Sequence, residues 1–394
     1  MERETLLMTP GPTMVPVRVL EAMGRQLIHH RTKMFEEVFA RLEEDLRFVF
    51  QTGNDVVIMA SSGTGAMEAA VSNLFSPGEK VLAVSIGSFG DRFADIAQAF
   101  GLDVLRLSFP WGTAMETDRI LQILEEDREG RIRGVLVTHN ETSTGVTNDI
   151  ESLGKRMAGG DRLLVVDAIS SLGGLDLKAD EWGIDVVVTG SQKALMAPPG
   201  LAFASVSEKA LAACERGTSP RFYWDFRKYI KALRKQVSEN PPFTPAVSAI
   251  LGQAEALRMI REEGLSQVFN RHKAMALATQ AGVTALGLAL FPEQPVSSHI
   301  ITAVKAPEGL DIEKVRKNMQ SRYHVQCAGG QKHLKGQILR IGHCGYMDVD
   351  DLIRGFTALE CALADEQPDR RLGASLPAVL DTYRKVMNKG AEEI

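Results

Sequence analysis

Short apolar runs alternate with amphipathic segments along the chain up to about residue 240. The runs are rich in Val, Ile and Leu, which is typical of strands whose two faces are both covered. Between them, Met67, Ala70, Val71 and Leu74 recur at helical spacing and form one apolar face. Strands that alternate with helices predict a mostly parallel, doubly wound α/β sheet. The expected strands are 55–60, 80–86, 103–107, 133–139, 162–168 and 185–189.

The pattern changes at the proline-rich stretch Pro241–Pro245. A long helical segment follows over 247–286, with a break near Gly264. Beyond it the pattern predicts a smaller α+β domain and then a charged tail with one more helix at Leu376–Lys389. The expected elements of the smaller domain are strands at 297–304 and 337–341 and helices at 311–322 and 349–363.

The amino-acid composition argues against several classes of protein. The 394 residues carry 45 Lys and Arg against 50 Asp and Glu, a net charge of −5, so we expect no nucleic-acid or anionic-membrane partner. The 4 cysteines are far apart, which disfavours disulfides and predicts no metal site. With no apolar segment long enough for a signal or a membrane span, the sequence predicts a soluble, cytoplasmic protein.

Three candidate sites come directly after predicted strands, where ligands bind on such sheets. Ser62-Gly63-Thr64 opens a helix, and small residues at a helix N-terminus suit a phosphate. Asp167 ends an apolar strand and would need a cation or a strong donor if it is buried. Lys193 is a candidate nucleophile for a carbonyl group. Taken singly, these residues also fit an ordinary turn, a capping aspartate and a surface lysine.

A fourth candidate, Arg340, lies inside an apolar strand of the smaller domain, where it could hold a carboxylate through two hydrogen bonds. An internal ion pair is the alternative for a single arginine. Together the four candidates match the needs of pyridoxal phosphate: a phosphate cup, an aspartate for the ring nitrogen, a lysine for the aldehyde and an arginine for the substrate.

Four longer motifs occur in order: THNETSTGV at 138–146, VDAISSLGG at 166–174, GSQKALMAPPG at 190–200 and LRIG at 339–342. With them, the chain from Thr9 to about Ala364 resembles the class V aminotransferases, specifically the alanine–glyoxylate and serine–pyruvate group. The resemblance implies the α/β fold type I of pyridoxal-phosphate-dependent transferases. The implied parts are an N-terminal segment at 1–15, a large domain at 16–255, a small domain at 256–368 and a tail at 369–394.

The resemblance also assigns roles to individual residues. Lys193 and Asp167 are the catalytic pair. Gly11 and Arg340 line the substrate site, and Arg340 binds the α-carboxylate. Thr244 reaches the phosphate of the neighbouring subunit, which implies a homodimer with shared active sites. The remaining cofactor contacts are Ser62, Gly63, Thr64, Phe89, Thr142 and Gln192, with Phe89 stacked on the ring.

Three positions depart from the animal enzymes of this group. Phe89 replaces a tryptophan, Thr64 a histidine and Pro241 a tyrosine. The implied activity is transfer of an amino group from a small amino acid, alanine or serine, to a 2-oxo acid, glyoxylate or pyruvate. The alternatives are a cysteine desulfurase that uses Cys327, an aminotransferase for 2-aminoethylphosphonate or ureidoglycine, and a non-catalytic relative.

Overall fold

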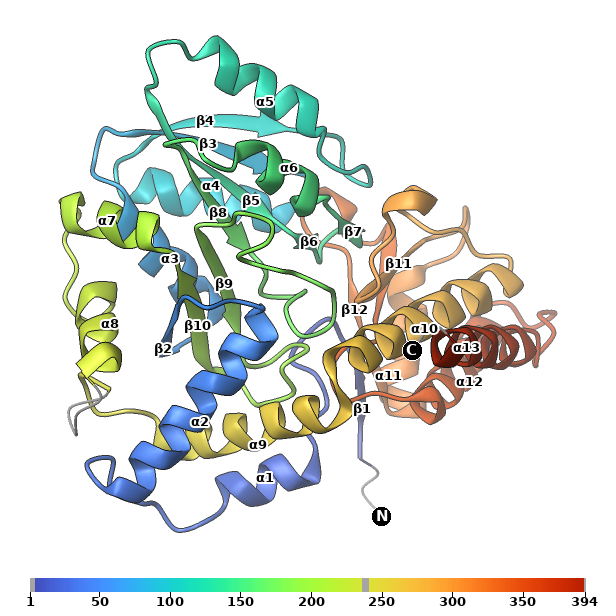
Figure 1. The fold of residues 1–394 in the computed structure, drawn as a ribbon. Coiled ribbons are helices and arrows are strands. Elements are labelled where there is room, and N and C mark those ends of the chain that lie inside the picture. The colour runs from blue at the N-terminus through green and yellow to red at the C-terminus, as the bar shows by residue number, and fades with distance from the viewer. Residues whose placement is uncertain (1–3, 236–240, 393–394) are drawn as a thin grey trace.

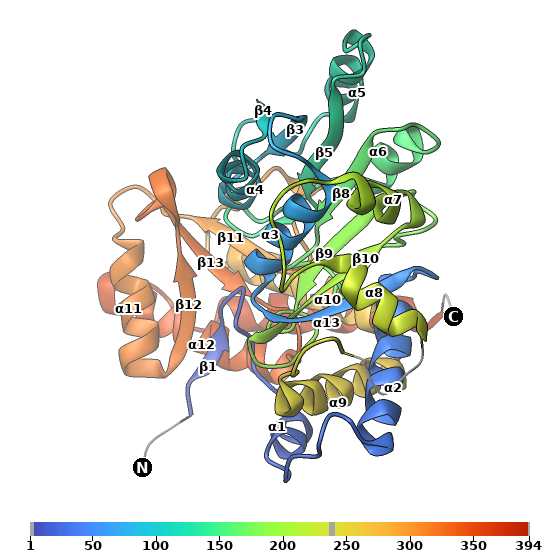
Figure 2. The same ribbon diagram turned by 90° about the vertical axis from the view of Figure 1, so that its left-hand side faces the viewer.

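The computed structural model describes residues 4–235 and 241–392, which form a seven-stranded sheet and a four-stranded sheet (Figures 1 and 2). The large sheet has the order β2-β10-β9-β8-β5-β3-β4. All six strands expected for it are present, each within about two residues of its predicted bounds. The strands are β2 (Asp55–Ser61), β3 (Lys80–Ser85), β4 (Asp103–Ser108), β5 (Ile132–Thr138), β8 (Leu163–Asp167), β9 (Val186–Gly190) and β10 (Gly200–Val206).

Neighbouring residues of these strands enter two different cores. Val56 and Ile58 of β2 belong to one apolar cluster, and Val57 and Met59 to the other, so both faces of the sheet are buried. One face is covered by α3 (Gly63–Leu74), α4 (Ser88–Ala99), α7 (Glu208–Arg216) and α8 (Phe226–Lys235). The other is covered by α2 (Lys33–Phe50), α5 (Thr117–Glu126), α6 (Ile150–Met157) and α9 (Val247–Glu263).

Strand β10 was not predicted, and it is antiparallel to both of its neighbours, β2 and β9. Its sequence, GLAFASV, mixes small and polar residues with few β-branched ones, so it gives a weak strand signal. The sheet is therefore mostly parallel, as expected, with one antiparallel strand between β2 and β9.

The small sheet has the order β1-β12-β13-β11 and is covered by helices from the C-terminal part of the chain (Figure 2). Its first strand comes from the N-terminus, because β1 (Leu6–Met8) pairs in parallel with β12 (Val325–Gly329). The other strands are β13 (Ile338–Gly342) and β11 (Ile301–Lys305). The helices of this part are α10 (Leu265–Ala285), α11 (Ile312–Tyr323), α12 (Val349–Glu366) and α13 (Ser375–Glu392).

The predicted break near Gly264 is confirmed. Gly264 has φ +84 and separates α9 from α10, two helices that run on from the large sheet toward the small one (Figure 1). The helix expected in the tail is α13, which packs along α10 and buries Val379 in the small core. Among the residues that the structure describes, no helix combines the length and apolar character that crossing a bilayer requires. The division of the chain into four parts stays a prediction.

Candidate active site

Lys193 follows β9 in a tight turn, and its side chain points under the N-terminal segment. Its Nζ donates a hydrogen bond to the carbonyl oxygen of Pro10 at 2.7 Å. Gly11 lies so close that a Cβ there would be 2.4 Å from Nζ, and its φ of +136 also favours glycine. Burial lowers the pKa of the Lys193 amine, which increases the share of the neutral, nucleophilic form.

Asp167 ends β8, one strand away from β9, and only 3% of its surface is exposed. Within the described chain one hydrogen bond to its carboxylate is found, from the backbone N–H of Ile169 at 2.9 Å. Burial raises the pKa of Asp167 to about 7, and the neighbouring carboxylate of Glu141 acts in the same direction. A buried carboxylate with so few donors is stabilised when a ligand brings a cation or a strong donor.

The N-terminus of α3 begins directly after β2. Ser62 is the N-cap residue, but its side chain makes no capping hydrogen bond, so the hydroxyl remains available to a ligand. A Cβ on Gly63 would lie 2.7 Å from Ile169, so this close approach needs glycine. Free N–H groups at a helix N-terminus attract anions. This end of α3 therefore has the chemistry of a phosphate site.

These groups surround a single pocket of about 140 Å³ at the carboxyl ends of the large sheet's strands. Eight of the residues singled out from the sequence line it together, and their roles stay predictions. The eight are Ser62, Gly63, Thr64, Phe89, Thr142, Asp167, Gln192 and Lys193.

The pocket wall also contains residues that the sequence analysis missed. The Arg92 guanidinium lies 4.7 Å from the centre of the Phe89 ring and donates to the Thr64 hydroxyl at 3.2 Å. Asn140 is held on both sides, donating to Ser170 Oγ and accepting from the Thr147 hydroxyl. The spacing of Arg92 three residues after Phe89, on one helical face, was the available signal.

Arg340, in β13 of the small sheet, is not one of the residues that line the pocket, but it contacts the pocket residue Thr142 and is only 5% exposed. Its Nε donates to the carbonyl of Gly329 at 2.8 Å, and its Nη1 donates to the carbonyl of Thr142 at 2.7 Å. Burial lowers the pKa of Arg340 to about 10. These two bonds use Nε and Nη1, and no described residue is hydrogen-bonded to Nη2, so a carboxylate ligand could bind there.

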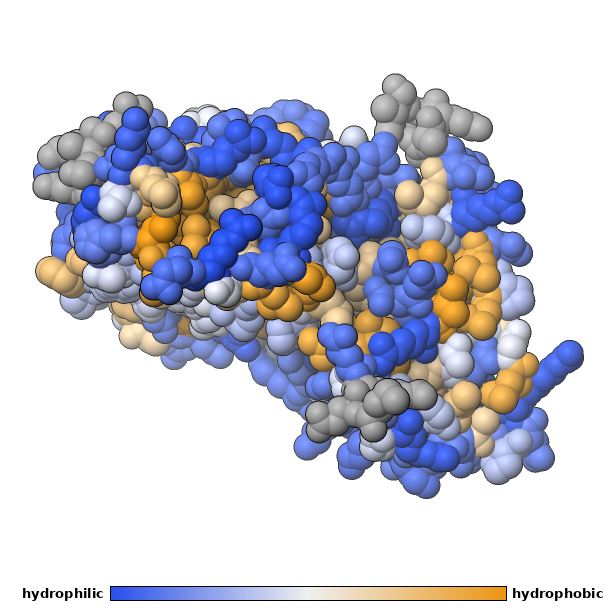
Figure 3. All heavy atoms as spheres, turned by 90° about the horizontal axis from the view of Figure 1, so that it is seen from below, coloured by the Kyte–Doolittle hydropathy of each residue, from blue (hydrophilic) through white to orange (hydrophobic). Residues whose placement is uncertain are grey.

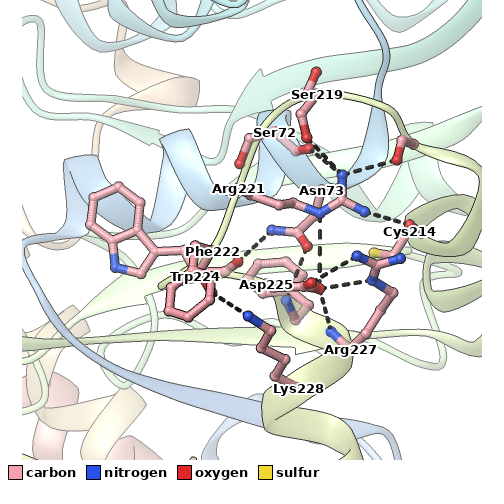
Figure 4. Close-up of polar contacts among 12 residues, drawn as sticks. Ser72, Asn73, Cys214, Ser219, Arg221, Phe222, Trp224, Asp225, Arg227 and Lys228 are labelled. Carbon is pink, nitrogen blue, oxygen red and sulfur yellow. Dashed lines mark hydrogen bonds and ion pairs between the residues drawn. The ribbon is translucent and has the colours of Figure 1, made fainter. Parts of the chain in front are cut away.

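Thr244 lies elsewhere in its own chain. It is exposed and lines a separate small cavity with Tyr223 and Phe243, not the pocket around Lys193. The nearby aromatic segment 222–226 is held to α3 by buried polar groups (Figure 4). Asn73 of α3 donates to the carbonyl of Trp224 at 2.6 Å and accepts from the N–H of Phe226.

Arg221 completes this attachment, because its guanidinium donates to four backbone carbonyls around it, those of Ser72, Cys214, Gly217 and Ser219 (Figure 4). Phe222 is nevertheless 72% exposed. The segment is thus fixed in place and presents the Phe222 ring outward, with its centre 5.8 Å from that of the Phe243 ring.

Cys327 is buried in β12, and burial raises its pKa to about 12. A thiol in that setting stays protonated and is a poor nucleophile. Among the described residues, no group of three or more His, Cys, Asp or Glu side chains is arranged to hold a metal ion.

The sequence profile of the family Aminotransferase class-V matches residues 5–352, most of the chain. The chain belongs to this family. The enzyme is therefore a pyridoxal-phosphate-dependent transaminase of fold type I.

Relatives of this aminotransferase carry several names. The chain is 44% identical over 93% of its length to a Synechococcus protein, covering 94% of it, that is named the small subunit of a soluble hydrogenase. It is 38% identical to a serine–glyoxylate aminotransferase of Methylorubrum extorquens, with 96% of each chain covered. The solved ureidoglycine–glyoxylate aminotransferase of Bacillus subtilis matches with a TM-score of 0.92 at 29% identity, covering 98% of this chain and 99% of that one.

Proposed function

We propose that this aminotransferase holds pyridoxal phosphate in the pocket around Lys193 and moves an amino group from serine or alanine to glyoxylate or pyruvate. The observation that carries the proposal is the poorly solvated Asp167 carboxylate in the same pocket as the Lys193 amine. Two relatives with different amino donors, serine and ureidoglycine, share glyoxylate as the acceptor, which supports glyoxylate as the acceptor here.

The residues of the pocket fit the cofactor. The uncapped N-terminus of α3 suits its phosphate, and Asp167 suits a protonated ring nitrogen. The Phe89 ring suits one face of the cofactor ring. Bound there, the cofactor would supply an electron sink for the substrate's α-carbon.

The protein's own groups then bind and move protons. Arg340 binds the substrate carboxylate through Nη2, while the carbonyls of Thr142 and Gly329 keep its guanidinium in one orientation. The Lys193 amine takes the α-proton and returns it, and its lowered pKa suits a base that works near neutral pH. Pro10 and Gly11 cover the lysine and keep water from it.

The proposal includes a homodimer in which Thr244 serves the partner's pocket. In support, Thr244 is exposed and lies outside the pocket of its own chain. Apolar surface is also present on the side of α1 (Val17–Met23) and α9 (Figure 3), and Val17 of α1 is 68% exposed. The proposal places the enzyme in the cytoplasm, where the free thiols of Cys214, Cys327, Cys344 and Cys361 would stay reduced.

Among the alternatives, the desulfurase lacks support because the Cys327 thiol is buried and protonated. Ureidoglycine remains the second candidate donor, favoured by the TM-score of 0.92 to the B. subtilis enzyme. Serine and ureidoglycine differ only in the group attached to the α-carbon. In the proposal, Arg340 binds the carboxylate and the other pocket residues bind the cofactor, so these residues do not distinguish the two donors.

Borohydride reduction of the protein with pyridoxal phosphate tests the proposal. The cofactor should become fixed to the peptide that contains Lys193, and the Lys193→Ala variant should stay unlabelled. The unreduced enzyme with its cofactor should also be mixed with single amino acids in the absence of an acceptor. Serine or alanine should then yield about one equivalent of oxo acid per site. A protein that neither binds the cofactor nor is labelled would exclude the proposal.

A further inference from the structure

Glu141 is a second buried carboxylate beside the pocket, and none of its surface is exposed. It lies in β6 (Asn140–Glu141), between Asn140 and Thr142, which both line the pocket. Its Oε2 accepts from the backbone N–H groups of Phe89 at 3.0 Å and Gly90 at 3.1 Å. Its Oε1 accepts from the Ser143 N–H at 3.0 Å and from the Ser143 hydroxyl at 2.6 Å.

The hydrogen-bond donors around Glu141 determine the protonation state of its carboxyl group. The Ser143 hydroxyl oxygen accepts from the N–H of Ser88 at 2.9 Å, so its own hydrogen points to Glu141. Both oxygens of Glu141 thus accept hydrogen bonds, and a proton on Oε2 would point at two backbone N–H groups, which cannot accept it. Burial raises the pKa of Glu141, but these four hydrogen bonds act against that shift and favour the carboxylate.

Glu141 is linked both to the turn that carries Phe89 and to Arg340. On one side it binds the N-terminal turn of α4, the turn that presents Phe89 to the pocket. A Cβ on Gly87 would lie 2.4 Å from Glu141 Cγ, so only glycine permits this approach. On the other side, the next residue, Thr142, holds Arg340 through its carbonyl oxygen. The Glu141 charge also opposes the fall in the pKa of Arg340.

We infer that Glu141 is a positioning residue, which sets the aromatic wall at Phe89 and the substrate-binding Arg340 in one fixed arrangement. The inference rests on the proposed function, because it assigns the cofactor to the Phe89 wall and the substrate carboxylate to Arg340. Glu141 touches neither ligand and acts through the α4 backbone and the Thr142 carbonyl.

The test is the Glu141→Gln variant, which keeps the size of the side chain but replaces one acceptor oxygen with an NH₂ donor. That donor must face either two backbone N–H groups or the Ser143 pair, so the α4 turn or the 141–143 segment has to move. We expect KM for both substrates and the dissociation constant for pyridoxal phosphate to rise, each of the order of tenfold. Cofactor affinity is measured on the apoprotein by fluorescence titration and needs no turnover.

Glu360→Gln is the matched control. Glu360 is also a buried glutamate, and it accepts from the N–H of Ser375 at the start of α13 and from the Ser375 hydroxyl, within the small core. We expect this variant to lose thermal stability while KM and cofactor affinity stay unchanged. The milder Ser143→Ala variant removes one hydrogen bond to Glu141 and should shift KM in the same direction as Glu141→Gln, by less.

A double-mutant cycle separates positioning from general destabilisation. If Glu141 acts through Arg340, Glu141→Gln should raise KM in the wild-type enzyme but add little in the Arg340→Gln background. Additive effects, or a lowered melting temperature with unchanged KM and cofactor affinity, would overturn the inference. Failure of the proposed function has a different signature, since the wild-type protein itself would then bind no cofactor and transfer no amino group.

Discussion

Two buried carboxylates, Asp167 in the pocket and Glu141 beside it, come from different regions and have opposite surroundings. Glu141, in the wall between α4 and the small sheet, accepts four hydrogen bonds from the protein. Asp167, at the carboxyl end of the central strand β8 of the large sheet, accepts one. A carboxylate satisfied by its own chain stabilises the local structure, whereas one left short of donors costs stability until a ligand supplies them. The contrast supports the proposal that Asp167 binds a ligand.

Of the variants that test this contrast, Asp167→Asn should have the largest effect on activity. Asparagine fills the same space but carries no charge to keep a ring nitrogen protonated. We expect kcat/KM to fall by about 10²–10³-fold at saturating cofactor. Steady-state transamination assays measure it, with Glu360→Gln as a buried carboxylate control outside the pocket. Retention of more than about a tenth of the wild-type activity would contradict a role for Asp167 in catalysis.

Arg340→Lys tests whether Arg340 binds the substrate carboxylate. Lysine keeps the positive charge but loses the planar fork that bonds Thr142, Gly329 and a ligand carboxylate together. We expect KM for both substrates to rise by about 10- to 100-fold, with a smaller change in kcat. Arg316→Lys, in an ion pair on α11, is the matched control and should leave KM unchanged. Equal KM values for the two variants would show that Arg340 does not bind substrate.

The smallest effect is a pH-dependent difference in the stability of the cofactor-free protein. The pKa of Asp167 is about 7 in the fold and 3.8 in the reference state. Between these values the folded protein holds a proton that the unfolded chain has lost, so Asp167 lowers stability progressively as pH rises from about 4 to about 7. The groups that face it are Glu141, Arg92 and Lys193.

Asp167→Asn should therefore melt at a higher temperature than wild type at pH 8, by roughly 2–5 °C, and at nearly the same temperature at pH 4. Differential scanning calorimetry of the two apoproteins measures this difference. Buried His139, His272 and His343, whose pKa values are lowered to about 4, 3 and 3, destabilise both proteins alike in acid and cancel in the comparison. A difference that does not change with pH would contradict a raised pKa at Asp167.

The contrast also shows which parts of the site could be predicted. Asp167 and Lys193 each follow a continuous apolar strand, and parallel strands bring their carboxyl ends to one edge, so their meeting follows from the pattern. Glu141 gave no such signal, because a charged residue in a polar turn is usually exposed to water. The burial of Glu141 depends on the packing of α4 against β6.

Strand order was the other part that the sequence pattern did not predict. The N-terminal strand β1 has three residues and joins the small sheet more than 300 residues away in the chain, beside β12. This pairing carries Pro10 and Gly11 over Lys193. Hydrophobic periodicity is a local property and contains no information on which distant segment supplies the neighbouring strand.

The sequence by itself determined the alternating α/β architecture, the positions of six strands of the large sheet and the placing of a lysine and an aspartate at strand ends, because each depends on the order of nearby residues. Tertiary structure alone decided how many donors each buried carboxylate receives, which carbonyls orient Arg340 and that Thr244 stays outside its own pocket. Those features depend on contacts between distant segments, and the free energy of a buried charge is set by its neighbours in space.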